Sequence, residues 1–288
     1  MILIACLAGL MLSCEDKFLP QDQDVTIVEG WIDADGFPVV MVTRSLPVRL
    51  RDNAISLDNL YDYVDKWAKV TVSDGEHLAV LTGKMDNNYV PGYIYTSNYI
   101  RGEAGKTYTL TVQTRGRTVK AQTTIPLYPP TVDSVVCRHA ETDTSMCEVI
   151  AYVKHQAGRE EYFKSFYQEG ADAQQFLSSF LGVVDCGLAD SAFNMPIIRG
   201  VSDYDKSDDS RYFANDTLVK LKISTMDQVS YEIWRSYEDN NRFRSAFLSS
   251  SVREVGSNIV GGRGYWCGFN SFRLDFKAVP GTYTGNNF

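Results

Sequence analysis

The sequence predicts a mainly β protein: an N-terminal immunoglobulin-like β-sandwich, then a C-terminal β-rich domain with one or two helices. Three observations carry this prediction. Short runs of β-branched and aromatic residues alternate with polar ones, turn residues separate them about every eight to twelve positions, and helical periodicity is confined to the second half. With 44% hydrophobic residues, the composition is that of a folded chain and excludes a disordered one.

Chain length and proline placement predict two domains. A chain of 288 residues is longer than one hydrophobic core usually serves. Pro126, Pro129 and Pro130 end the first series of strand-like runs. We therefore expect the sandwich to cover 23–128 and the second domain to cover 131–288.

The first half reads as a series of short strands. The strongest hairpin signal is 67–81, in which two alternating runs flank the turn residues Asp74 and Gly75. Asp33, Asp35 and Gly36 form a second turn signal, for which the alternative is a calcium loop. The other predicted strands are 25–32, 39–43, 89–99, 107–114 and 118–125.

The second half mixes strand and helix signals. Residues 171–181 are compatible with a short helix. A longer helix is predicted after 225–228, which have capping-box spacing, because apolar residues then follow a helical period towards Phe247. The predicted strands are 132–137, 147–154, 218–224 and 265–276, and 160–168 is an aromatic run.

The N-terminus predicts export and lipidation. Residues 2–12 are almost wholly apolar, a length that suits the hydrophobic region of a signal peptide. Met11-Leu12-Ser13-Cys14 resembles a bacterial lipobox, in which the cysteine is acylated. We expect 1–13 to be a signal peptide, Cys14 to carry lipid such as palmitate, and 14–22 to be a tether. The alternative is an N-terminal strand or buried helix.

Four cysteines remain in the predicted mature chain beyond Cys14, and an even number in an exported protein suggests disulfides. Cys137 and Cys147 flank a polar segment between two strand-like runs, which favours pairing them. Elimination then pairs Cys186 with Cys267. The alternative is that these cysteines are free, buried thiols.

Charge and motifs exclude several functional classes. A net charge of −8 argues against nucleic acid as a partner. The sequence has no G-x-S-x-G or H-E-x-x-H motif, and its three histidines (His77, His139 and His155) are scattered. We therefore predict a non-enzymatic protein without metal or cofactor. A triad assembled only in three dimensions, and hence a secreted hydrolase, remains the alternative.

Two further segments resemble ligand loops. The glycine-rich stretch 256–264 does not have the strand-before, helix-after context of a phosphate cradle, so we expect backbone turns with positive φ or close packing there. The acidic stretch 203–209 departs from an EF-hand pattern. It reads as a solvated loop, with a looser calcium site as the alternative.

Four tyrosines are the predicted contacts for a ligand or partner: Tyr89, Tyr93, Tyr95 and Tyr99. Tyr93 and Tyr95 would share one face of a strand, and aromatic faces suit sugar rings or protein partners. The alternative is that these tyrosines fill the core or edge of the sandwich.

Several short motifs together resemble a known family. They lie at 28–32, 68–72, 92–93, 105–112, 125–126, 133–134 and 257–264. In these motifs the chain resembles the Bacteroidota lipoprotein family labelled domain of unknown function 4249. The resemblance implies an outer-membrane, surface-facing lipoprotein of the kind often encoded beside TonB-dependent transporters. The predicted role is a ligand-binding or accessory partner of such a transporter, and a structural or adhesive surface protein is a further alternative.

Overall fold

The computed structural model describes residues 24–45, 61–141, 143–156, 158–171, 175–187, 192–200, 211–244 and 255–284. Cys14, the predicted signal peptide and tether, and the acidic stretch 203–209 lie outside these residues. Within them, no helix is long and apolar enough to cross a membrane.

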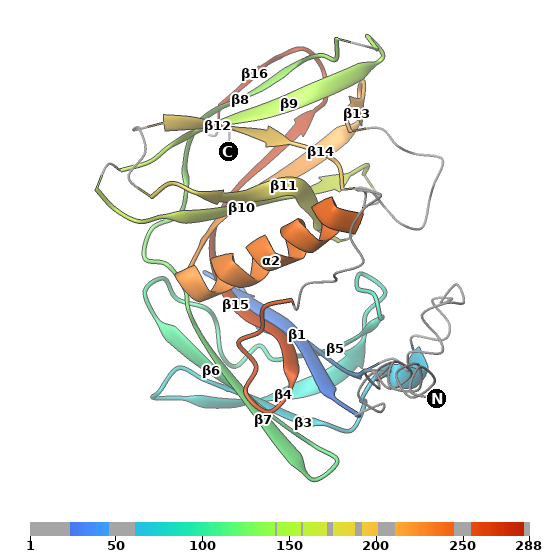
Figure 1. Cartoon of the computed structure of the whole chain (residues 1–288), viewed down its shortest axis with the longest axis vertical. Helices are drawn as coiled ribbons and strands as arrows, with labels where there is room; N and C mark the ends of the chain where they lie inside the picture. The colour runs from blue at the N-terminus through green and yellow to red at the C-terminus, as the bar shows by residue number, and fades with distance from the viewer. Residues whose placement is uncertain are drawn as a thin grey trace, which may run out of the picture.

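The described chain is mainly β, which confirms the predicted fold class (Figure 1). Its helical elements are the 3-10 turn η2 (Tyr61–Tyr63) and helix α2 (Gln228–Arg244). Its strands are β1 (Thr26–Asp33), β2 (Val39–Arg44), β3 (Lys69–Ser73), β4 (Leu78–Met85), β5 (Tyr93–Thr96), β6 (Thr107–Thr114), β7 (Arg117–Thr124), β8 (Thr131–His139), β9 (Met146–Lys154), β10 (Tyr162–Glu169), β11 (Leu177–Asp185), β12 (Ala192–Ile197), β13 (Phe213–Ala214), β14 (Leu218–Met226), β15 (Arg263–Lys277) and β16 (Gly281–Tyr283).

One sheet runs through the molecule, in the order β11-β10-β14-β15-β1-β2-β5-β4-β3-β6-β7. Strand β15 lies between β14 and β1 in this sheet and pairs with each of them along a different part of its length. The first half of β15 pairs in parallel with β1, and the second half pairs in antiparallel with β14. In Figure 1, β15 passes from the upper half of the molecule into the lower half, beside β1.

The first core lies inside the part of this sheet that runs from β15 to β7. Inward residues of β1, β2, β3, β4, β6 and β7 form one buried cluster, which also contains Trp266 of β15. The Trp266 Nε1–H donates to the Tyr108 carbonyl at 3.0 Å. The Gly268 N–H donates to the Thr123 hydroxyl at 2.7 Å, so the last strand, β7, lies back against β15. The sandwich core is therefore completed by a strand from the far end of the chain.

The second core lies between the other end of the large sheet and a smaller sheet. The smaller sheet has the order β12-β9-β8-β16, with β13 also paired to β9. Its inward residues pack on alternate residues of β10, β14 and β15. Helix α2 lies on the opposite face of the large sheet, over β10, β11 and β15, where a third cluster includes Phe166, Cys267 and Phe269 (Figure 1). Because β15 enters both cores, the division at 128–131 stays a prediction about independent folding units.

Local sequence signals correspond to the structure in most places. The hairpin at 67–81 is confirmed: the Asp74 N–H donates to the His77 carbonyl at 3.2 Å, and Gly75 has a φ of 95°. In the glycine-rich stretch, Gly261 and Gly264 have φ values of 82° and 112°. A Cβ at Gly264 would collide with the Val28 carbonyl. The predicted positive φ and close packing are thus confirmed.

Two local predictions are corrected. Residues 177–185 form strand β11, not part of a short helix, because they complete the large sheet beside β10. The longer helix exists, but its N-cap is Asp227, not Thr225: the Ser230 N–H donates to Asp227 Oδ1 at 2.8 Å. Asp227 Oδ2 also accepts from the Thr124 N–H at 3.0 Å, so the cap ties α2 to β7.

Candidate functional site

A cavity of about 410 Å³ lies on the face of the large sheet that α2 partly covers. Its walls come from elements far apart in sequence: β1, β2, the segment 89–90, β10, the segment 175–178, β14, α2 and β15. Both halves of the molecule therefore contribute to it. Its size is typical of sites for small ligands.

Strand β1 supplies three consecutive outward side chains to this cavity. Glu29, Trp31 and Asp33 line it, while Val28 and Ile32, which alternate with them, are buried in the first core. This follows from the two-residue period of a strand, which sends successive side chains to opposite faces. The strand therefore has one apolar face for folding and one face of carboxylate, indole and carboxylate.

Asp33 is the centre of a charged cluster at one end of the cavity. The Lys222 ammonium donates to Asp33 Oδ1 at 2.6 Å and to Oδ2 at 2.9 Å. The Ser271 hydroxyl donates to Oδ1 at 3.1 Å, and Arg273 Nη2 lies 3.5 Å from Oδ2. Burial lowers the pKa of Lys222, and the Asp33 carboxylate opposes that shift.

Glu29 lies at the other end of the cavity, where no cation or hydroxyl from the described ranges contacts its carboxylate. It has no hydrogen-bond or ion-pair partner among the residues that the structure describes. Burial raises the pKa of this carboxyl. Burial first, and then the negative charge of Glu29, also raise the pKa values of Tyr237, to about 12, and of Tyr265. Glu29 is thus a carboxylate enclosed by aromatic rings.

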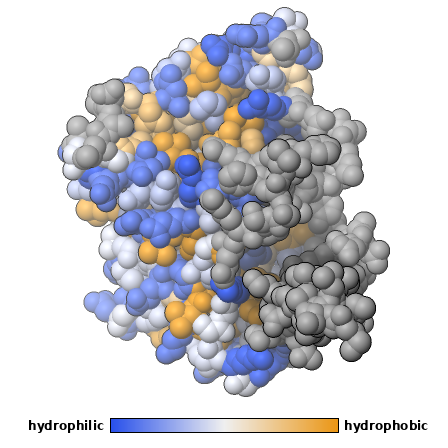
Figure 2. Space-filling model, viewed as in Figure 1, coloured by the Kyte–Doolittle hydropathy of each residue, from blue (hydrophilic) through white to orange (hydrophobic). Residues whose placement is uncertain are grey.

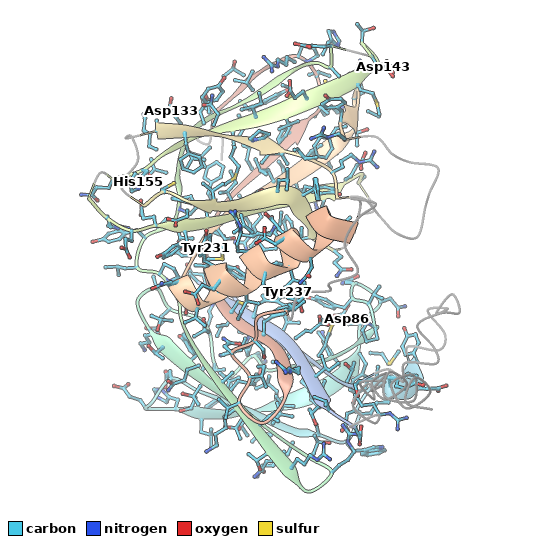
Figure 3. The ribbon with its side chains drawn as sticks, in the orientation of Figure 1. Asp86, Asp133, Asp143, His155, Tyr231 and Tyr237 are labelled. Carbon is cyan, nitrogen blue, oxygen red and sulfur yellow. The ribbon has the colours of Figure 1, made fainter. Side chains whose placement is uncertain are left out.

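Aromatic rings form much of the remaining wall. Trp31 and Tyr89 have ring centroids 5.9 Å apart, and Trp234 and Tyr265 have centroids 5.3 Å apart. The Lys222 ammonium lies 5.2 Å from the centre of the Phe269 ring. Such a wall offers apolar area and π-faces to a ligand. Figure 3 places Tyr237 on α2, near the middle of the molecule where the two halves meet.

The four tyrosines predicted to contact a ligand or partner lie in different environments in the structure. Tyr89 lines the cavity, whereas Tyr95 is buried in the first core, where its hydroxyl donates to the Asp65 carbonyl at 2.6 Å. Burial raises the pKa of Tyr95 to about 12. Tyr93 packs edge-on against Tyr95, with ring centroids 5.6 Å apart, and 73% of Tyr99 is exposed. Tyr89 is therefore the member of the four that joins the candidate site.

The predicted disulfide between Cys137 and Cys147 is wrong, because both are free, buried thiols. Cys137 lies opposite Val149, and Cys147 lies opposite His139, so the two cysteines are diagonal neighbours on paired strands. Diagonal positions are roughly 7–8 Å apart, beyond the reach of about 6.8 Å between the Cα atoms of a disulfide. The Cys147 thiol donates instead to Asn215 Oδ1 at 3.1 Å.

The predicted pair of Cys186 and Cys267 is wrong as well, because both thiols are free and buried. Cys186 belongs to the second core, whereas Cys267 belongs to the cluster under α2. Burial raises the pKa of each thiol to about 12. That is the opposite of the lowered pKa that activates a cysteine nucleophile.

The histidines lie away from the cavity. His77 is in the β3–β4 turn, with its Nδ1 3.3 Å from Asp74 Oδ2. His155 is buried beside Glu161, with its Nδ1 3.0 Å from Glu161 Oε2. Figure 3 shows His155 well separated from Tyr237. The cavity lining, as far as the structure describes it, contains no histidine.

Sequence reasoning missed Glu29, Lys222 and Arg273, and it assigned Asp33 to a turn or a calcium loop, not to this cavity. The available signal was a charged residue inside a strand-like run: Glu29 lies within the β-branched run 25–32, and Lys222 alternates with the apolar residues of 218–224. Such a residue marks the face of a strand that is turned away from the core. The signal does not reveal that the two strands are neighbours of the same β15.

A comparison with protein-family models identifies a family for this chain. A family model described as "Domain of unknown function (DUF4249)" matches residues 15–274, which is most of the sequence. This is the family that the sequence motifs resemble. A comparison with curated proteins gives no match.

Proposed function

The chain belongs to the DUF4249 family, and we propose that it is a lipid-anchored outer-membrane protein of Bacteroidota that captures a ligand for a TonB-dependent transporter. In this proposal Cys14 holds the lipid, the protein faces the cell surface, and it performs no catalysis. The observation that carries the ligand-binding part is the cavity between the two halves. Ligand sites favour concave, mostly apolar places at such junctions, with a few polar groups.

The lining of the cavity favours binding over hydrolysis. Its two carboxylates, Glu29 and Asp33, are four residues apart on one strand, or roughly 13 Å along it. Carboxylate pairs that cleave glycosidic bonds stand about 5–9.5 Å apart. Asp33 is moreover engaged in an ion pair with Lys222 at 2.6 Å.

A purely adhesive role receives less support. A protein that works by surface adhesion is expected to expose a broad, continuous apolar patch. On the face shown in Figure 2, apolar residues lie in several separate groups among hydrophilic ones. The most exposed large apolar residues include Trp67, Leu78, Tyr99 and Val260, which come from separate parts of the chain.

The lipid anchor is tested by mass spectrometry of the protein purified from its native membrane. We expect a diacylated or triacylated N-terminal peptide that begins at Cys14. The Cys14→Ser variant should be found in the soluble fraction, whereas Cys6→Ser should remain at the membrane. An unmodified Cys14 in the purified native protein would contradict the proposed anchor.

The partnership is tested by affinity purification from detergent-solubilised outer membrane. We expect a TonB-dependent transporter barrel to co-purify with the native protein at near-equal amounts. The bait with Cys14→Ser, purified from the soluble fraction and added to the same membranes, controls for a requirement for the lipid. Reproducible absence of any transporter barrel from both purifications would remove this part of the proposal.

A further inference from the structure

The charges that line the cavity are separated along its length. Glu29 lies beside Tyr265, and Asp33 lies beside Phe269, in the parallel register of β1 and β15. Lys222 and Arg273 are a register pair of β14 and β15 and contact Asp33. The negative charge of Glu29 is therefore at one end of the cavity, and both cations are at the other.

The Glu29 end suits an ammonium group. The Glu29 carboxylate has no polar partner in the described chain, and Tyr265 and Trp234 line the cavity with it. A cation there would gain a charge-assisted hydrogen bond to the carboxylate and contact with ring faces. It would also relieve the cost of keeping this partly buried carboxylate charged.

The Arg273 end suits a carboxylate group. One negative group, Asp33, faces two cations, so this end carries one excess positive charge. Lys222 is enclosed, and 49% of the Arg273 side chain is exposed. Arg273 touches Asp33 only at 3.5 Å, so its guanidinium keeps donors for a second carboxylate. Arginine binds carboxylates with two parallel hydrogen bonds.

We propose that this cavity binds a short peptide with free ends, whose terminal ammonium contacts Glu29 and whose terminal carboxylate contacts Arg273. The two ends lie roughly 13 Å apart, as estimated from four residues along β1. An extended peptide of three or four residues spans this distance at about 3.3–3.6 Å per residue. Its apolar side chains would lie against Trp31, Tyr89 and Phe166. The inference rests on the proposed ligand-capturing function and names the class of ligand.

The first experiment uses the full-length protein, purified in detergent, and a tripeptide library with alanine at both ends and every amino acid in the middle. Thermal-shift screening selects the strongest ligand, and isothermal titration calorimetry then measures its Kd. We expect an aromatic or large aliphatic middle residue to bind best, because the wall is aromatic. If no member binds with a Kd below about 1 mM, which corresponds to about −4.1 kcal/mol, the proposal is overturned.

The second experiment combines blocked peptides with protein variants. N-acetylation of the peptide and Glu29→Gln should each weaken binding roughly tenfold to a hundredfold, as for loss of one charge-assisted hydrogen bond. Acetylation should cause no further loss in the Glu29→Gln variant. C-terminal amidation and Arg273→Gln should behave in the same way at the other end. Glu232→Gln and Arg235→Gln, on the part of α2 outside the cavity, are the matched controls.

Two outcomes separate this inference from the function it rests on. If blocked and free peptides bind equally well, the ends are not recognised and the inference is wrong. If a transporter co-purifies with a protein that binds no peptide, the proposed function stands and only the ligand class is rejected. Circular dichroism of each variant confirms folding, and Glu29→Gln is expected to fold at least as well as the native chain because it removes an unpaired carboxylate.

Discussion

The Glu29 carboxylate lies in a buried environment that disfavours its charged form. Its neighbours on β1, Val28 and Gly30, are buried, and its own side chain faces the rings of Tyr237 and Tyr265. A residue of this kind costs stability and is retained where it serves a site. The Asp33 carboxylate, four residues later on the same face, has the opposite situation because Lys222 neutralises it.

Replacement of Glu29 by glutamine should therefore raise the Tm at pH 8. Burial raises the pKa of Glu29 above 4.5 in the folded state, so the folded protein holds its proton more tightly than the unfolded one. The loss of folding stability caused by burying the charged carboxylate is complete above the pKa of Glu29 in the folded state. This loss shrinks as the pH falls towards 4.5. Thermal unfolding measured from pH 4 to pH 8 should thus show a higher Tm for Glu29→Gln than for the native chain at pH 8, and this difference should disappear on acidification. A lower Tm for the variant at pH 8 would contradict this explanation.

The cysteines lead to a second prediction at this scale. Because Cys137, Cys147, Cys186 and Cys267 are free thiols in the structure, dithiothreitol should leave the Tm unchanged. Loss of a disulfide would cost about 2–5 kcal/mol and lower the Tm by several degrees. The thiols are buried, so they should react with Ellman's reagent only after unfolding. A reductant-sensitive Tm would show that a disulfide forms after all.

At the scale of the elements, helix α2 is fixed to the sheet by a buried ion pair. The Lys164 ammonium of β10 donates to Glu238 Oε1 of α2 at 3.1 Å and to the Ser179 carbonyl of β11 at 3.1 Å. The same Glu238 oxygen accepts from the Val183 N–H at 3.0 Å. Burial lowers the pKa of Lys164. This one ion pair therefore holds together β10, β11 and α2, which all line the cavity.

Lys164→Met should destabilise the protein by about 3–5 kcal/mol, because it leaves the Glu238 charge buried without a partner. Addition of Glu238→Gln should recover much of this loss, since glutamine is neutral and still accepts from Val183. Urea unfolding measures each free energy. Arg235→Gln removes an exposed pair with Asp239 on the same helix and should change stability by less than about 0.5 kcal/mol. Equal losses in the single and double variants would contradict the role of the buried charge.

At the scale of the whole molecule, β15 joins the two halves. Its residue Trp266 is fully buried in the first core, although most of that core comes from residues 28–125. Its later residues Leu274 and Phe276 are buried in the second core. The cap residue Asp227 and the Lys222–Asp33 pair add polar contacts between the halves. The cavity is formed at this joint.

A fragment with residues 23–128 should therefore not fold by itself. Without β15 it loses the Trp266 ring, exposes the edge of β1 and leaves Val28 and Ile32 partly uncovered. We expect no cooperative thermal transition, as measured by circular dichroism. A synthetic peptide of residues 255–271, added in excess, should restore one. A fragment that unfolds cooperatively without the peptide would support the independent sandwich domain predicted from the sequence.

The sequence by itself determined the local elements. The alternation of 107–114 produced β6 in the expected place, and the Asp74-Gly75 turn produced the expected hairpin. The glycine-rich stretch correctly predicted backbone turns with positive φ at Gly261 and Gly264. These features depend on φ/ψ preferences and on side-chain period, which are properties of neighbouring residues. The family could be recognised for the same reason, because its motifs are short and contiguous.

Only the tertiary structure decided which distant segments meet. The parallel pairing of β1 with β15 joins residues that are more than two hundred positions apart, and no local pattern encodes it. That pairing places Glu29 beside Tyr265, brings Asp33 to Lys222 and builds the cavity. It also keeps Cys186 and Cys267 in different clusters, against the disulfide predicted by elimination. Period and propensity fix a strand and its faces, whereas the choice of neighbour depends on burying apolar surface across the whole chain.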